Sequence, residues 1–248
     1  MQHSRSASAT NAVRLRFPEL NPPLDQPSAA YSPKNGTTWT NTYRPALVAR
    51  EGHLRASVMS FLNMHLFGEL LVNLLRARKR TFIDHLGWKL QQIDGMEFDQ
   101  YDSPLCRWIV IHEFGEVLGG IRLTPTTACN GIYSYMLRDA QRGLLDGLPT
   151  DVLFFEAPVS AATMEASRLF IAEDIPAHRR LRIQAMLMAQ LSEIAQELGA
   201  DHVIGIVPAV WSRWLRRLDL DAIPVGPKFT IDGATSQAAL FRTSRHRN

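Results

Sequence analysis

The sequence predicts a mixed α/β fold with a central sheet flanked by helices. Residues 107–112 and 117–123 are rich in β-branched and apolar residues and are separated by a Gly-containing turn, which is typical of an antiparallel hairpin. Residues 177–198 carry apolar side chains at helical spacing, and a buried strand is expected directly after them at 202–207. The strand expected at 164–171 precedes this helix. The helix is therefore a crossover between two neighbouring strands.

Before the hairpin, the chain predicts three segments of different character. Turn formers are frequent and periodicity is weak in residues 1–50, so we expect a disordered N-terminal extension. Apolar residues recur at helical spacing from Leu54 to Arg78, which predicts an amphipathic helix that continues or restarts through Phe82. The acidic stretch 93–104 is expected to be a loop.

After the hairpin, the remaining elements are short. We expect a helix at 135–141, a loop at 143–158, Gly199 as the C-cap of the long helix, a helix at 210–218, and short strands near Ile223 and Ala238. The whole arrangement predicts a single domain over residues 51–244 and a tail at 245–248.

Composition narrows the class of protein. The chain has 248 residues and a net charge of +3, and 46% of its residues are hydrophobic. This composition is typical of a globular protein. No apolar run is long enough to span a bilayer, and the N-terminus lacks the apolar segment of a secretory signal. Cys106 and Cys129 form no disulfide framework or metal pattern, so we expect a cytoplasmic protein without a metal site.

The basic residues are unevenly spread. A nucleic-acid interface would need a recognition helix or aromatics interleaved on a basic strand, and the sequence has neither. An acidic protein partner is the better match for clustered arginines. The two clusters are Arg179, Arg180 and Arg182, and Arg213, Arg216 and Arg217.

Three acids lie close together at Glu97, Asp99 and Asp102. Clustered carboxylates need a cation, which can be a metal, an arginine or a cationic ligand. A metal is disfavoured because no His or Cys stands nearby at ligand spacing. Two alternatives remain: structural pairing with Arg78 and Arg80, or a cationic ligand.

Arg122 lies among apolar residues of an expected strand, so it should be buried and paired. Its planar fork suits a carboxylate, either that of Asp99 or Asp102 or that of a ligand. A structural salt bridge is the more frequent role for such an arginine.

Strand alternation places Glu165 and Ser167 on one face and Arg168 on the other. A Glu beside a Ser can order a water molecule and accept a proton from an amine. Ser167 is not surrounded by the G-x-S-x-G pattern of a serine nucleophile. An edge strand with a polar outer face explains these residues equally well.

Phe82 and Trp88 flank the acidic stretch on its N-terminal side. Such a pair can stack on an adenine or pack against a sulfonium by cation–π attraction. Aromatic residues at such positions are more often part of the core.

Taken in order, these motifs resemble those of the LuxI-type acyl-homoserine-lactone synthases over about residues 66–244. The C-terminal segments 205–208, 225–227 and 231–233 are similar to the branch of the family that makes branched or aryl signals. The matching motifs are Arg78, Phe82 and Trp88; Glu97, Asp99, Tyr101 and Asp102; Arg122 to Thr127; Tyr135 to Leu137; and Glu165, Ser167 and Arg168.

The resemblance implies a fold like that of the GNAT acyltransferases and a quorum-sensing synthase. The reaction it implies joins S-adenosylmethionine, as a substrate rather than a cofactor, to an acyl thioester. The amine forms an amide, and the carboxylate then closes a lactone and releases methylthioadenosine. Glu165 with Ser167 would deprotonate the amine. The implied S-adenosylmethionine site consists of Arg78, Phe82, Trp88, Asp99, Asp102, Arg122 and Arg168, with a bulge needed to bring Arg168 to the acids.

The acyl half of the reaction lies where the chain departs from the family. Residues 128–134 are an insertion, and Ala140, Gln141 and Arg142 stand where an aromatic residue is usual. Gly205 and Val207 are expected to line the acyl pocket, and a glycine offers no hydroxyl to a 3-oxo group.

The acyl carrier is either an acyl carrier protein or coenzyme A. Residues 179–185 contain no glycine to cradle a pyrophosphate, which favours an acidic carrier protein docked on the two arginine clusters. The resemblance to the branched-signal branch keeps a coenzyme A donor open. Alternative functions are another GNAT-like N-acyltransferase that uses coenzyme A and an amine, and a non-catalytic binding protein of the same fold.

Overall fold

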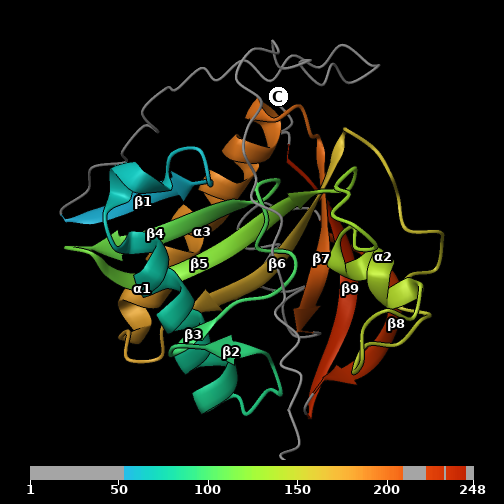
Figure 1. Cartoon of the computed structure of the whole chain (residues 1–248), viewed down its shortest axis with the longest axis horizontal. Helices are drawn as coiled ribbons and strands as arrows, with labels where there is room; N and C mark the ends of the chain where they lie inside the picture. Colours follow the sequence, from blue (N-terminus) through green and yellow to red (C-terminus); the bar gives the residue numbers. More distant parts are fainter. Residues whose placement is uncertain (1–52, 209–221, 232, 244–248) are drawn as a thin grey trace, which may run out of the picture. The chain divides into compact units, whose positions relative to one another are not determined.

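The computed structural model describes residues 53–208, 222–231 and 233–243, and a mixed sheet is its central feature (Figure 1). The strand order in this seven-stranded sheet is β1-β4-β5-β6-β7-β9-β8. All neighbours are antiparallel except β6 and β7, which are parallel. The strands are β1 (Leu54–Met59), β4 (Arg107–Glu113), β5 (Glu116–Pro125), β6 (Thr163–Ile171), β7 (His202–Pro208), β8 (Ala222–Ile231) and β9 (Ala234–Arg242).

Helices cover both faces of this sheet. The longest, α3 (Ala177–Glu197), connects β6 to β7 and lies on one face (Figure 1). Its apolar side chains are buried against that face. The opposite face carries α1 (Leu70–Arg78) and α2 (Met136–Gln141), each with its own apolar cluster. Within the described residues, no helix is long and apolar enough to cross a membrane.

The main predictions of architecture are confirmed. The hairpin is formed by β4 and β5, the crossover by β6, α3 and β7, and the expected short helix by α2. Of the apolar face predicted for α3, Leu187, Leu191 and Ile194 are buried, and Leu198, just after the end of the helix, is half-buried. Gly199 follows that helix with φ +80°, the left-handed conformation expected of a C-terminal cap.

The helix predicted from Leu54 is wrong in its first part. Residues 54–59 form the edge strand β1, each of them paired with a residue of β4. Leu54 and Ala56 lie in the core cluster under α3, while Arg55 between them is exposed, and this two-residue alternation suits a strand. After the short helix η1 (Met64–Phe67) and Gly68, α1 begins at Leu70.

Other boundaries differ less. The helix does continue beyond Arg78 through Phe82, as the wider helical segment η2 (Lys79–His85). The expected loop 93–104 overlaps a small hairpin of β2 (Gln92–Ile93) and β3 (Met96–Glu97). The two C-terminal strands are ten and nine residues long instead of short. The predictions for residues 1–50, 210–218 and 245–248 fall outside the described residues.

The parallel pair β6–β7 positions the site. The two strands pair from Thr163 and His202 as far as Ala166 and Gly205. Both strands then continue, β6 to Ile171 and β7 to Pro208, without further pairing to each other. The sheet therefore opens beyond Ala166, between two strands whose side chains face both sides of it.

Candidate active site

A ring of charged side chains lies on the face of the sheet that carries α1 and α2. Arg78, at the C-terminus of α1, is only 1% exposed. Its Nε donates to Oε2 of Glu97 at 2.5 Å, and its two terminal nitrogens donate to the carboxylate of Asp102 at 2.7 and 3.0 Å. The indole Nε1 of Trp108 donates to the same carboxylate at 2.9 Å. The acidic stretch is therefore fixed to α1 by a buried arginine.

Arg122 holds the third acid from the middle of β5. It binds Asp99 with both terminal nitrogens, at 2.5 and 3.1 Å, as the planar fork predicts. Its Nε donates to Oγ of Ser167 at 3.1 Å, since Arg122 and Ser167 are paired across β5 and β6. Arg122 thereby connects the acidic loop to the polar face of β6.

Arg168 completes the ring through an irregularity of β6. Strict alternation would turn it away from Ser167, but its φ is +54° and the β5–β6 register shifts between Gly120 and Arg122. This bulge brings Arg168 onto the acids, with Nε at 3.1 Å from Glu97 and a terminal nitrogen at 2.8 Å from Asp99. Three arginines and three carboxylates thus neutralise one another.

Burial and ion pairing have opposite effects on the pKa values of the charged groups in this ring. Burial alone would raise the pKa of Asp99 and of Asp102. At Asp99, the lowering effects of Arg122 and Arg168 on the pKa exceed the raising effect of burial. At Asp102, those of Arg122 and Arg78 do the same. The pKa of each carboxyl therefore lies below its ordinary value. Burial would likewise lower the pKa of Arg122, but Asp99 and Asp102 raise it. All these groups are therefore held in their charged forms.

Glu165 lies beside the ring, fully buried on β6. Its two carboxylate oxygens accept the backbone N–H groups of Met136 at 2.9 Å and Leu137 at 2.7 Å, which open α2. Burial raises the pKa of Glu165 to about 7, against the lowering effect of these two N–H donors. Glu165 is therefore a helix cap and, near neutrality, a group able to gain or lose a proton.

Two residues outside the predicted site support this arrangement: Tyr101, which belongs to the acidic motif, and Asp139. The ring of Tyr101 lies over the guanidinium of Arg122 at 5.5 Å, and its hydroxyl donates to Asp139 at 3.0 Å. Asp139, on α2, also accepts the backbone N–H and the hydroxyl of Ser134 at 2.8 and 2.7 Å. Burial, followed by Asp139, raises the pKa of Tyr101. In the sequence, the place of Tyr101 within the acidic motif was the signal that could have identified it.

The aromatic pair belongs largely to the core. Phe82 is buried in the cluster under α1 and stacks on the half-buried Trp88 with ring centroids 5.0 Å apart. The guanidinium of Arg168 lies 5.8 Å from the Phe82 ring centroid. The aromatic residues therefore border the charged ring through Arg168.

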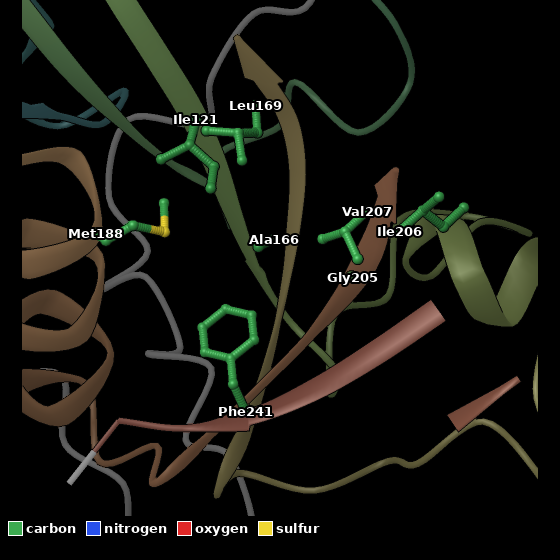
Figure 2. Close-up of a pocket in the computed structure, with 8 residues that line it drawn as sticks. All are labelled: Ile121, Ala166, Leu169, Met188, Gly205, Ile206, Val207 and Phe241. Atoms are coloured by element: carbon green, nitrogen blue, oxygen red, sulfur yellow. The ribbon is translucent and has the colours of Figure 1, made fainter. Parts of the chain in front are cut away.

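An apolar pocket lies at the opening of the sheet beyond Ala166 and Gly205 (Figure 2). Met188 reaches into it from α3 and Phe241 from β9 (Figure 2). Its total empty volume, including the part open to solvent, is about 320 Å³. Gly205 and Val207, the two residues expected at an acyl pocket, both line it. The full lining is Ile121, Ala166, Leu169, Met188, Gly205, Ile206, Val207 and Phe241.

Two of the arginines expected to dock a carrier have partners among the described residues. Arg179 forms an ion pair with Glu113 at 2.8 Å, and Arg180 donates to the carbonyl of Glu173 at 2.7 Å. Arg182 is exposed. The second cluster, Arg213, Arg216 and Arg217, lies outside the described residues.

The two departures from the family pattern have structural partners. In the insertion, the ring of Tyr133 packs edge-on against Tyr101 at 6.3 Å, so this segment covers the acidic loop. Gln141 is one of the three residues that stand where the resemblance leads us to expect an aromatic residue, and its side chain binds the following loop. Its amide nitrogen donates to the carbonyl of Phe155 and its oxygen accepts the N–H of Ala157, both at 2.8 Å.

Comparison with known proteins gives one family. The family model described as autoinducer synthase matches residues 65–247. An acyl-homoserine-lactone synthase of Acinetobacter nosocomialis is 30% identical over 172 residues, covering 66% of this chain and 87% of the relative. An isovaleryl-homoserine lactone synthase of Bradyrhizobium diazoefficiens is 27% identical over 182 residues, covering 73% of this chain and 76% of the relative.

Solved structures agree with the fold. TofI, in a ternary complex with an inhibitor and MTA, superposes with a TM-score of 0.61 at 27% identity, covering 76% of this chain and 91% of TofI. The synthase LasI gives a TM-score of 0.65 at 23% identity, covering 78% of this chain and 92% of LasI. The described chain therefore has the GNAT-like acyltransferase fold that the motifs predicted.

Proposed function

The chain belongs to the autoinducer synthase family and is an acyl-homoserine-lactone synthase, and from this premise we propose how its residues divide the reaction. S-adenosylmethionine binds over the ring of arginines and acids, Glu165 receives the proton of its amine, and the acyl chain occupies the apolar pocket. The observation that carries this assignment is the buried Glu165 carboxylate beside a ring that is already neutral.

The charge balance supports binding of this substrate. The three arginines and three acids of the ring sum to zero. S-adenosylmethionine brings a sulfonium, an ammonium and a carboxylate, which sum to one positive charge. Ionised Glu165 supplies the matching negative charge, and the bound cation in turn favours its ionised form.

The two chemical steps need different help from the site. In the first, Glu165 takes a proton from the ammonium, and the freed lone pair attacks the thioester carbonyl. A C–N bond forms, the C–S bond of the thioester breaks, and the nitrogen gives a second proton to the leaving thiolate, which departs as the thiol. In the second, the carboxylate oxygen attacks the γ-carbon, a C–O bond forms, and the C–S bond breaks to release neutral methylthioadenosine. The fixed ring holds the substrate in one orientation through both steps.

The acyl group is proposed to be branched or unsubstituted. The pocket is lined by apolar side chains and by Gly205, which provides no hydroxyl for a 3-oxo group. A methyl group at Gly205 would lie 2.5 Å from the carbonyl oxygen of Ala166, so this wall cannot bear a larger residue without movement of the strand. The isovaleryl-homoserine lactone synthase among the relatives supports a branched chain.

The test is a reconstituted reaction. The purified chain is incubated with S-adenosylmethionine and with isovaleryl, straight-chain and 3-oxo acyl groups, each presented on coenzyme A and on an acyl carrier protein. Mass spectrometry then measures lactone and methylthioadenosine. Isovaleryl lactone should form fastest, and the faster carrier identifies the donor. Absence of both products with every donor would refute the function, and turnover of a simple amine without S-adenosylmethionine would indicate the alternative N-acyltransferase.

A further inference from the structure

Thr124, near the end of β5, carries a buried hydroxyl without a hydrogen-bond partner among the described residues. It is 1% exposed. Thr126, two residues further on, is equally buried, but its Oγ1 donates to the carbonyl groups of Ser160 and Thr163 at 2.8 and 3.0 Å. An unpaired buried hydroxyl destabilises the folded state, and a valine of the same shape would avoid this cost. Such a group in a native structure calls for an explanation in function.

The strand geometry shows what the Thr124 hydroxyl faces. Leu123 packs into the core under α3, so Thr124 points to the opposite face, the one that carries the charged ring. Thr124 is the direct cross-strand partner of Glu165, as Arg122 is of Ser167. Direct partners point to the same face with Cβ atoms about 4.5–5.5 Å apart. The unpaired hydroxyl is therefore the neighbour of the Glu165 carboxylate.

Glu165 has acceptor capacity left for such a neighbour. Each of its oxygens accepts one backbone N–H, and each carboxylate oxygen has two lone pairs. Thr124 makes no direct hydrogen bond to it, and polar groups held just beyond that distance are commonly bridged by one water molecule. Ser167 on the same face accepts a hydrogen bond from Arg122 Nε, whereas the Thr124 hydroxyl has no partner at all among the described residues.

We propose that Thr124 is a positioning residue for amide formation, whose hydroxyl holds the water molecule that carries a proton from the substrate ammonium to Glu165. The water accepts one proton from the nitrogen and gives another to Glu165. The water is thereby restored, Glu165 becomes neutral, and the nitrogen keeps the lone pair that attacks the thioester. This assignment rests on the proposed function and adds to it a residue outside the charged ring.

The test uses a valine and a serine at this position. Thr124→Val keeps the shape and removes the hydroxyl. The single-turnover rate of amide formation should fall about tenfold or more, while the KM for S-adenosylmethionine stays within about threefold. The unfolding midpoint should fall less than that of Thr126→Val, because the Thr124 hydroxyl has no hydrogen-bond partner among the described residues. Thr124→Ser should recover most of the rate. Thr126→Val is the matched control, and it should lose stability because it removes a partnered hydroxyl.

Three results would overturn the proposal. Thr124→Val could retain the wild-type rate, it could raise KM with kcat unchanged, or it could lose as much stability as Thr126→Val. The first means that the hydroxyl has no part in turnover, the second that it binds substrate directly, and the third that it is a structural partner. If the wild-type chain forms no lactone, the proposed function itself fails, and this outcome is distinct from the other three.

Discussion

Glu165 should make activity and stability change in opposite directions over the same pH range. Its pKa is raised by burial to about 7 from an ordinary value of 4.5. Proton abstraction needs the ionised form, so kcat/KM should rise about tenfold between pH 6 and pH 8 as that form becomes dominant. The substrate amine also titrates near the upper end of this pH range, so the change between pH 6 and pH 7 reports more directly on Glu165.

Stability should follow the neutral form. A raised pKa means that folding favours the protonated acid, so the stabilisation is complete below pH 4.5 and is lost as pH rises to 7. The slope in that window is about 1.4 kcal/mol per pH unit, with a plateau above it. Asp99 and Asp102 act in the opposite sense, because their pKa values are lowered and their contribution is lost only in stronger acid.

The assay compares the wild-type chain with Glu165→Gln. Urea unfolding of the free protein at several pH values from 5 to 8 gives the stability, and the difference between the two proteins removes the contribution of histidines that titrate in the same range. Gln cannot titrate, so its curve should lack the slope. Glu165→Gln should also lower turnover far more than it lowers S-adenosylmethionine binding. Equal slopes for the two proteins would refute a Glu165 pKa near 7.

Three further changes test other parts of the molecule. Asp102→Asn removes the buried partner of Arg78 and should lower the free energy of unfolding in urea by about 3–5 kcal/mol, whereas an unchanged midpoint would contradict the ring. Gly205→Ala places a methyl 2.5 Å from the carbonyl oxygen of Ala166, so it should lower the free energy of unfolding by about 1–3 kcal/mol. It should also reduce turnover of the longest acyl chains most, which competition between acyl donors measures. Gln141→Leu removes two hydrogen bonds to the loop after α2, so the N–H of Ala157 should exchange its hydrogen faster, and protection equal to wild type would argue against this role of Gln141.

The sequence predicted the elements whose signals are local. Residues 177–197 repeat apolar side chains over several turns, and that periodicity survives in any tertiary context. Residues 54–59 are too short for such a test, because their apolar side chains fit both a helix and a strand. Pairing with β4, a segment about fifty residues away in the chain, decides between the two. The residue pattern of 54–59 by itself does not show with which distant segment it pairs.

The charged ring was predictable in its members and less so in its geometry. Clustered carboxylates need positively charged partners, so the sequence alone connects Asp99 and Asp102 with nearby arginines. Alternation placed Arg168 on the wrong face, because a bulge depends on the register of β5 against β6. The contact between Glu165 and the start of α2 was also beyond the sequence, since it joins residues 28 and 29 positions apart through backbone groups.

Three consecutive residues of β6 connect the two halves of the reaction. Glu165 and Ser167 face the charged ring, while Ala166 between them lines the apolar pocket on the other side of the sheet. The pairing with β7 ends at Ala166 and Gly205, both of which line the apolar pocket. The proposed function places the amine beside Glu165 on one side of β6 and the acyl group in this pocket on the other. In the proposed function, β6 thereby sets the distance between the proton acceptor and the acyl group. Substitutions that separate β6 from β7 should therefore slow amide formation before they weaken binding of either substrate.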